Sequence, residues 1–158
     1  MTMLSKIISG GQTGVDQAAL DAAISSECAY GGWLPAGRKT EAGPLSTKYQ
    51  MEVMGSANYA DRTKKNVQDA DATLIISNGP LTGGSALTER IARDLSKPCM
   101  HIDFTQFQGD HSLKQVALWL AAEDVAVLNV AGPRSSSDPG IYQRARSFIE
   151  KLLAEGAS

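Results

Sequence analysis

Short runs of apolar residues alternate along the chain with longer stretches in which apolar residues recur at helical spacing. The short runs predict strands over residues 4–9, 28–34, 72–77, 99–104 and 125–130. The longer stretches predict helices over residues 15–27, 59–69, 87–95, 113–120 and 141–152. This alternation is typical of βα units, so we expect a three-layer α/β fold with a mostly parallel sheet flanked by helices. The pattern does not determine the order of the strands.

Local signals mark where the predicted helices begin. Thr13 precedes Asp16 by three residues, the spacing of a capping box, ahead of the first helix. Ser85 is a candidate N-cap of the third helix, and Asp138-Pro139 has the order expected at the start of the last one. Residues 35–57 show no clear period and predict a long loop, of a kind that is usually functional or mobile.

Composition and charge narrow the class of protein. The 158 residues carry 15 lysines and arginines against 17 aspartates and glutamates, which leaves no excess of positive charge for binding nucleic acid or an anionic membrane. Cys28 and Cys99 form no CxxC pair, which excludes a disulfide framework and a zinc ribbon. No run approaches the roughly 20 apolar residues of a membrane helix, and residues 1–12 lack the apolar core of a signal peptide. We therefore expect a cytoplasmic protein with one domain over residues 1–158.

Glycine is the informative part of the composition, because most of the 15 glycines follow or end predicted strands. In an α/β sheet, ligands bind beyond the carboxyl ends of the strands. The first glycine loop joins the first strand to the first helix and consists of Gly10, Gly11, Gln12, Thr13 and Gly14. Such a loop brings the free N–H groups of a helix N-terminus toward an anion, so we interpret it as a phosphate-binding loop. A tight turn without a ligand is the alternative.

The second glycine loop has the same setting between a strand and a helix. It consists of Thr82, Gly83, Gly84 and Ser85, and Thr88 follows one turn later. Two such loops in a small domain predict a two-sided phosphate cradle. Ser85 as a helix cap and Thr88 as a solvated residue are the alternatives.

Three arginines are candidates for the same ligand. Arg134 directly follows a strand and precedes a predicted helix, where its guanidinium can fork onto a phosphate. Arg38 and Arg62 fall in segments that can fold over the top of the sheet. The alternative for each of the three arginines is a surface charge with no role in ligand binding.

The sequence contains no clear catalytic set. His101 and His111 have no partner at metal-ligand spacing, and no serine lies in a GxSxG elbow. Asp16 can act beside the first glycine loop, although its capping position explains it equally well, and Asp21 is interpreted as a solvated helix residue. We therefore expect a binding protein rather than an enzyme, with no metal site.

Several motifs, taken in order, resemble one family. They are Ile8-Ser9-Gly10-Gly11-Gln12-Thr13-Gly14-Val15-Asp16, Gly31-Gly32-Trp33, Gly79-Pro80-Leu81-Thr82-Gly83-Gly84, and Leu128-Asn129-Val130-Ala131-Gly132-Pro133-Arg134 with Pro139-Gly140-Ile141. Over nearly its whole length the chain resembles the molybdenum cofactor carrier family. That family belongs to a Rossmann-like group with the cytokinin-activating phosphoribohydrolases and the lysine decarboxylase-like proteins. The resemblance implies a Rossmann-like fold whose glycine loops hold the phosphate of molybdenum cofactor (molybdopterin) or a nucleotide, and a homodimer or homotetramer.

One motif departs from the phosphoribohydrolases, which carry the pattern PGGxGTxxE. Alignment on Gly83-Gly84 places Arg90 at the position of the glutamate, and Glu89 comes one residue early. On a helix this shift turns the carboxylate by about 100°. Hydrolysis by that mechanism is therefore disfavoured.

Three functional hypotheses follow. The first is a carrier that binds a small phosphorylated ligand through the glycine loops. The alternatives are a nucleotide-processing hydrolase that uses Asp16 or Glu89 as its acid or base, and a nucleotide sensor. For the first hypothesis we expect both Gly11→Val and Gly84→Val to abolish anion binding and to leave a folded domain.

Overall fold

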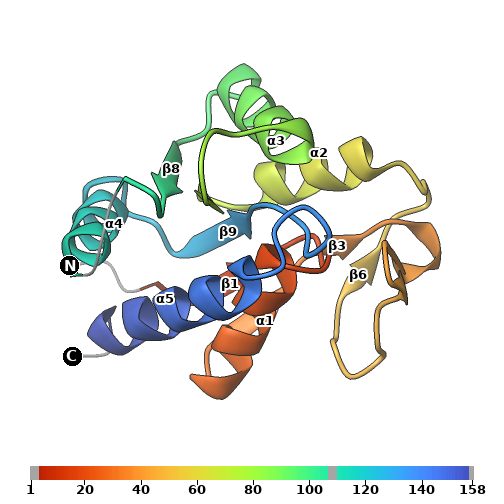
Figure 1. Cartoon of the computed structure of the whole chain (residues 1–158). Helices are drawn as coiled ribbons and strands as arrows, with labels where there is room; N and C mark the ends of the chain where they lie inside the picture. The colour runs from red at the N-terminus through yellow and green to blue at the C-terminus, as the bar shows by residue number, and fades with distance from the viewer. Residues whose placement is uncertain (1–3, 107–109, 157–158) are drawn as a thin grey trace.

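The computed structural model describes residues 4–106 and 110–156 (Figure 1). Its central sheet has five parallel strands in the spatial order β2-β1-β9-β7-β8: β1 (Lys6–Ile8), β2 (Ala29–Gly31), β7 (Ala72–Ser77), β8 (Cys99–Asp103) and β9 (Val127–Ala131). The chain therefore runs from β1 to one edge, crosses to β7 and β8 on the other side, and returns as β9 beside β1. The predicted three-layer α/β fold is confirmed, and it is Rossmann-like.

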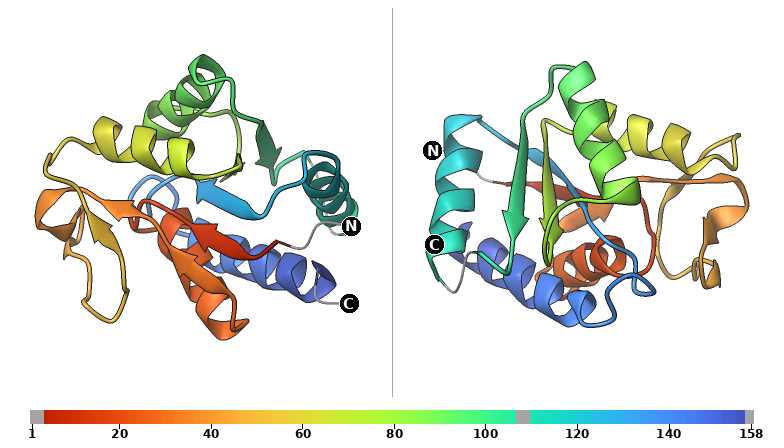
Figure 2. Two further views of the ribbon diagram at one scale, coloured as in Figure 1. Left: turned by 180° about the vertical axis from the view of Figure 1, so that it is seen from behind. Right: turned by 45° about the horizontal axis from the view of Figure 1, so that its top comes forward.

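Helices cover both faces of the sheet (Figures 1 and 2). Figure 2 shows α1 (Val15–Ser25) and α5 (Ile141–Gly156) together on one face, and α2 (Tyr59–Asp69) with α3 (Gly83–Asp94) on the other. The helix α4 (Asp110–Ala122) packs beside α5. The main core lies between the sheet and α1, α4 and α5, and alanines such as Ala18 and Ala22 of α1 are fully buried in it. The small-residue face predicted for the first helix therefore lets α1 lie close to the strands.

Residues 35–57 form ordered short elements where the pattern predicted a loop. They contain a 3₁₀ turn (Ala36–Arg38), the antiparallel pair β4 (Lys39–Thr40) and β5 (Gly43–Pro44), and β6 (Glu52–Val53), which pairs with β3 (Trp33–Leu34). Leu45 and Tyr49 are buried against Leu20 and Leu34 in a second small core. This burial gives the segment a fixed position although its sequence has no period.

The predicted strand over residues 28–34 is two strands. Gly32 has φ of +120° and separates β2 from β3. The side chain of Asn66 in α2 bonds both backbone groups of Trp33, accepting from its N–H at 2.8 Å and donating to its carbonyl at 3.1 Å. Trp33 is thus bound to α2 instead of continuing the central sheet.

Three of the predicted helix caps are wrong, although α1 and α5 begin at the predicted residues. The N-cap of α1 is Gly14, not Thr13, and the N-cap of α3 is Thr82, not Ser85, which lies in the first turn of α3. The helix α5 begins at Ile141, so the proline before it is not the first helical residue. At α1 and α5 the polar side chain suited to capping has another partner. Thr13 Oγ1 donates to Glu41 Oε1 at 2.5 Å, and the Asp138 carboxylate accepts from Asn78 Nδ2 at 2.8 Å.

None of the helices in the described part of the chain combines the length and apolar composition needed to span a membrane. The expected single domain over residues 1–158 includes residues 1–3, 107–109 and 157–158, which lie outside the described residues. That expectation stays a prediction.

Candidate functional site

A cavity of about 550 Å³ lies at the carboxyl ends of β1, β7 and β9. After β1 the chain first builds β2 on one side of β1 and later builds β7, β8 and β9 on the other side. Such a switch point in strand order is where α/β sheets bind ligands. Most of the predicted site residues line the cavity: Gly10, Gln12, Asp16, Arg62, Thr82, Gly83, Gly84, Ser85, Thr88 and Arg134. The other predicted residues, Gly11, Thr13, Gly14 and Arg38, are not part of its lining.

Three backbone N–H groups of the first glycine loop donate within the protein. The N–H of Gly11 donates to Ser9 Oγ at 3.3 Å, and the N–H of Thr13 donates to Gln12 Oε1 at 3.1 Å. The N–H of Gln12 donates to the Asp16 carboxylate at 3.2 Å. A phosphate bound at these three N–H groups would have to displace their protein acceptors. The interpretation of this loop as a phosphate-binding loop therefore stays a prediction.

Close packing explains the glycines of this loop. Gly14 has φ of +82°, and a Cβ there would lie 2.3 Å from the carbonyl oxygen of Pro133, in the loop after β9. Gly11 has φ of +71°, and its Cβ would lie 2.2 Å from Leu34 Cδ2 in the second core. The expectation that Gly11→Val leaves the fold unharmed is therefore wrong, because the new side chain would be strained and would overlap Leu34.

The side chain of Asp16 lies buried in the cavity wall beside Arg62. Asp16 Oδ2 and Arg62 Nη1 are 3.7 Å apart, and Arg62 Nη1 also donates to the carbonyl of Gly10. Burial raises the pKa of Asp16 to about 6, against the opposing effect of the Arg62 charge and of the hydrogen bond from Gln12. The capping interpretation of Asp16 is wrong in detail, since its carboxylate bonds an amide two residues before the N-cap of α1.

Gln12 lines the cavity with a donor that no protein atom satisfies. Its side chain is 5% exposed, and its Oε1 accepts from the N–H groups of Thr13 and Glu41. Within the described residues, its buried Nε2 has no hydrogen-bond partner. A buried amide donor without an acceptor costs free energy, so this position favours a ligand that brings an acceptor.

The second glycine loop is open to the cavity. The helix α3 begins at Gly83, its N-cap Thr82 makes no side-chain capping bond, and its first turn carries no acidic residue. A Cβ at Gly83 or Gly84 would meet nothing within 4 Å. In residues 4–106 and 110–156, no protein acceptor takes the N–H groups of Gly83 and Gly84. This helix N-terminus therefore offers free donors and a favourable dipole to an anion.

Polar side chains from β7 and β8 fix the turn that leads to the second glycine loop. Ser77 Oγ donates to the carbonyl of Gly79 at 2.6 Å and lies 2.6 Å from His101 Nε2. The Asp103 carboxylate accepts from the N–H of Gly79 at 2.7 Å. Hydrogen bonds from Thr105 and Gly79 lower the pKa of Asp103, so it stays an anionic acceptor. These contacts hold the start of α3 in place.

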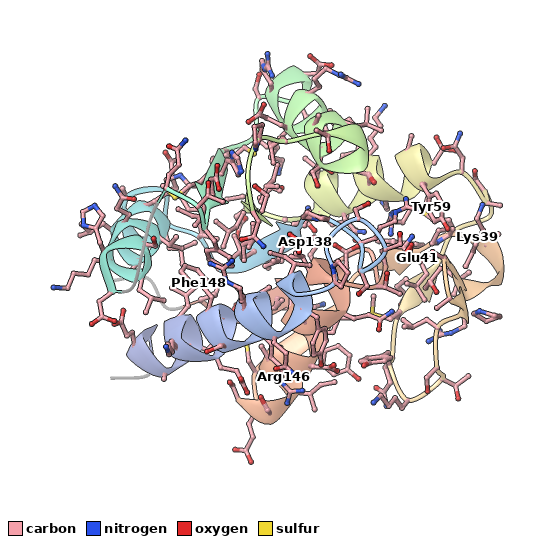
Figure 3. All side chains as sticks on the ribbon, viewed as in Figure 1. Lys39, Glu41, Tyr59, Asp138, Arg146 and Phe148 are labelled. Carbon is pink, nitrogen blue, oxygen red and sulfur yellow. The ribbon has the colours of Figure 1, made fainter. Side chains whose placement is uncertain are left out.

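Three cations surround the ring of Tyr59, which lies at the start of α2 and lines the cavity. Lys39 Nζ lies 4.5 Å from the ring centroid, and the guanidinium carbons of Arg62 and Arg134 lie 5.3 and 5.6 Å from it. Figure 3 shows Lys39 and Tyr59 side by side at this end of the molecule. Because Arg62 and Arg134 also line the cavity, this part of its wall is positively charged.

Arg38 has a structural role away from the cavity lining. Its guanidinium donates to the carbonyls of Leu45, Ser46 and Tyr49 at 3.1, 2.9 and 2.8 Å. These bonds hold the turn between β5 and β6 against the 3₁₀ turn. All three are to neutral carbonyl oxygens of the same segment.

The other carboxylates considered from the sequence lie elsewhere. Asp21 is not simply solvated, because it accepts from the hydroxyls of Tyr49 and Tyr142 and so joins α1 to the second core and to α5. Glu89 forms an exposed pair with Arg93 at 3.7 Å and does not line the cavity. Of the two proposed acid or base groups, only Asp16 therefore faces the candidate site. Within the described residues, no group of three or more histidines, cysteines or carboxylates is arranged to hold a metal ion.

Sequence reasoning missed Tyr59, Ser77 and Asp103. Ser77 and Asp103 are the last residues of β7 and β8, and a polar residue at the carboxyl end of a buried strand is the signal that could have identified them. Tyr59 opens a helix whose sequence shows no relation to the glycine loops. Its place in the cavity depends on how α2 packs over the sheet.

Comparison with known proteins identifies the family. Residues 7–153 match the model of the circularly permutated YpsA SLOG family. The crystal structure of a "Putative molybdenum carrier protein" from Syntrophus aciditrophicus SB superposes with a TM-score of 0.93, at 46% sequence identity and over 96% of each chain. No curated protein matches the chain. The resemblance drawn from the motifs is confirmed, and the chain belongs to the circularly permutated YpsA SLOG family.

Proposed function

We propose that this protein binds a small phosphorylated molecule in the cavity, with the phosphate at the N-terminus of α3. The free N–H groups of Gly83 and Gly84 supply donors, and the hydroxyl of Ser85 lies in the same turn. Arg62 of α2 and Arg134 of the loop after β9 supply positive charge in the cavity wall. Together these are the groups that hold a phosphate in α/β proteins.

The unpartnered Nε2 of Gln12 is the observation that carries this proposal. A helix N-terminus alone is common, but a buried amide donor without an acceptor, in the lining of the same cavity, favours a ligand that brings an oxygen or nitrogen acceptor. The cavity volume of about 550 Å³ falls in the range of small-molecule sites. A ligand of nucleotide size therefore fits both the space and the donors.

The similar structure from Syntrophus aciditrophicus bears the name of a molybdenum carrier, and this supports the pterin phosphate of molybdenum cofactor as the ligand. In that case the protein carries the cofactor as cargo. A nucleotide has the same phosphate chemistry and is the alternative ligand. Tyr59 places an aromatic side chain in the lining beside either kind of ring.

Calorimetry with purified protein tests the proposal. Molybdenum cofactor, AMP, ADP-ribose and NAD are titrated into the wild type, and we expect saturable binding of at least one of them. Gly84→Val should weaken that binding at least tenfold, because its side chain would occupy the approach to the α3 N–H groups. Gly55→Val is the matched control, since Gly55 is exposed, has open space at its Cβ and lies outside the cavity. Absence of binding for all four compounds to the folded wild type would reject the proposal.

Hydrolysis of a nucleotide is a second candidate function, and the buried carboxyl of Asp16 supports it. A pKa of about 6 lets this group give or take a proton near neutral pH, and it lines the cavity. Chromatography of a nucleotide panel after incubation would detect released base or ribose phosphate. Product formation that is lost in Asp16→Asn would support hydrolysis, and product formation that persists would exclude Asp16 as the acid or base.

A further inference from the structure

The carboxylate of Glu41 is held at the edge of the cavity like a bound anion. Glu41 lies in the turn between β4 and β5, and its Oε1 accepts from Thr13 Oγ1 at 2.5 Å and from the N–H of Ser136 at 3.1 Å. Its Oε2 accepts from Ser136 Oγ at 2.6 Å. In Figure 3, Glu41 reaches across to the loop that follows β9. Two hydroxyls and one backbone N–H thus converge on a single carboxylate.

The donors around Glu41 favour negative charge. The hydrogen bonds from Ser136 and Thr13, together with the charge of Arg134, lower the pKa of Glu41. The side chain of Glu41 is exposed, so burial does not hold it in this position. An exposed contact of this kind is weak and can exchange with another anion.

The groups around Glu41 border the proposed ligand cavity, although Thr13 itself is not part of its lining. Ser136 and Arg134 line it, and Thr13 Oγ1 is fixed in place because it also accepts from the N–H of Ser135 at 3.1 Å. We propose that Thr13, Ser136 and Arg134 form an anion subsite of the cavity, which Glu41 occupies as an internal competitor. This inference rests on the proposed function. The group that displaces Glu41 is an oxyanion of the ligand, such as a phosphoryl group separate from the one at α3.

Displacement of Glu41 is linked to the unpartnered amide of Gln12. The N–H of Glu41 donates to Gln12 Oε1 at 2.9 Å, while Gln12 Nε2 has no partner within the described residues. If the turn at Glu41 moves outward, Gln12 loses one of its two donors at Oε1 and gains freedom to turn its amide toward a ligand. The subsite and the buried donor therefore respond to the same movement.

A purely structural role of Glu41 and a competing role predict opposite changes in ligand affinity when Glu41 is removed. If Glu41 only fastens the turn between β4 and β5 to the loop after β9, its removal loosens the cavity wall and weakens ligand binding. If Glu41 competes with the ligand, its removal exposes the donors and tightens anion binding. The sign of the change in affinity separates the two roles.

The test is a titration of isotope-labelled protein with inorganic phosphate, followed by NMR at two backbone amides. Ser136 reports the proposed subsite, and Gly84 reports the phosphate site at α3. For Glu41→Ala we expect the Ser136 amide to saturate at phosphate concentrations about tenfold lower than in the wild type. Glu41→Gln, which keeps an acceptor but loses the charge, should fall between the two. Glu52→Ala removes the same charge from an exposed position on β6 and should match the wild type.

A second variant confirms where the anion binds. Adding Ser136→Ala to Glu41→Ala removes one donor hydroxyl and should abolish most of the gain in affinity. A Ser136 response that is no tighter in Glu41→Ala than in the wild type overturns the inference. Failure of the proposed function is recognised separately, because Gly84 would then respond to phosphate in none of the proteins.

Discussion

The two glycine loops look alike in sequence and differ in their packing and in how their backbone N–H groups are bonded. In the first, Gly11 and Gly14 have positive φ and no room for a side chain, and the N–H groups of Gly11, Gln12 and Thr13 donate to protein acceptors. In the second, Gly83 also has positive φ, at +51°, but a Cβ at Gly83 or Gly84 would meet open space, and their N–H groups have no acceptor among the described residues. Both loops join a strand to a helix at the same end of the sheet.

The difference shows that a glycine-rich βα loop can serve packing or binding. In the first loop, glycine lets the loop after β9 and the second core come close, and the loop contributes to the site through the side chain of Gln12, with Asp16 of α1 beside it. In the second loop, the absence of side chains leaves backbone donors exposed to the cavity. The acceptors of the backbone N–H groups distinguish the packing role from the binding role. The presence of glycine alone does not.

The largest expected effect is a loss of stability that follows a substitution in the first loop and not the equivalent substitution in the second. Gly14→Val should lower the free energy of unfolding by at least about 3 kcal/mol, because it combines positive φ with overlap on a backbone carbonyl. Gly84→Val should change it by less than about 0.5 kcal/mol, as a surface substitution does. Chemical denaturation of both variants gives the two values. Equal losses would show that the two loops do not differ as described.

The carboxylate of Asp16, in α1 directly after the first loop, should make stability depend on pH. The pKa of Asp16 is about 6 in the folded protein and lower in the unfolded chain, so the unfolded state ionises first as the pH rises. The stability contributed by Asp16 is therefore complete below pH 4 and is lost as the pH rises through 6. Relative to Asp16→Asn, the free energy of unfolding of the wild type should fall by up to about 3 kcal/mol between pH 4 and 7. Denaturation of both proteins across this range measures it, and a flat or rising difference would contradict it.

The first loop packs against the backbone of Arg134, which lines the cavity, so ligand affinity should depend on the charge of Arg134. We expect Arg134→Ala to weaken binding of a phosphorylated ligand by roughly 1.5 to 3 kcal/mol, the value of a hydrogen bond to a charged group. Arg38→Ala is the control, because Arg38 bonds only loop carbonyls and does not line the cavity. Calorimetry should show unchanged affinity in Arg38→Ala. An unchanged affinity in Arg134→Ala would mean that Arg134 is a surface charge that does not bind the ligand.

Much of the fold could be predicted because its signals are local. The helix over Tyr59–Asp69 and the buried strand Ala72–Ser77 have the predicted bounds, since helical spacing and a continuous apolar run are visible in a short window. The strand order was not predictable, because β9 takes its place between β1 and β7 through long-range pairing. The break at Gly32 also depends on a distant residue, Asn66 of α2.

The candidate site was predictable in its position and less so in its roles. The motifs located the residues near the carboxyl ends of the strands, and most of them line one cavity. They did not show that Arg38 bonds its own loop, or that Thr13 donates to Glu41, since residues 35–57 carry no periodic signal. A sequence shows which residues can donate, whereas the partner of each donor depends on the folded chain.

The smallest expected effect concerns the open N-terminus of α3. The capped N-terminus of α2 provides the comparison. The N-cap of α2, Asn58, accepts from the N–H of Ala60 at 2.8 Å, whereas Thr82 makes no such bond at α3. Asn58→Ala should therefore lower the free energy of unfolding by about 1 kcal/mol, and Thr82→Ala by less than about 0.5 kcal/mol. Thermal or chemical denaturation of the two variants compares them. A cost at Thr82 as large as that at Asn58 would mean that its hydroxyl caps α3, and the donors assigned to the ligand would then be satisfied by the protein itself.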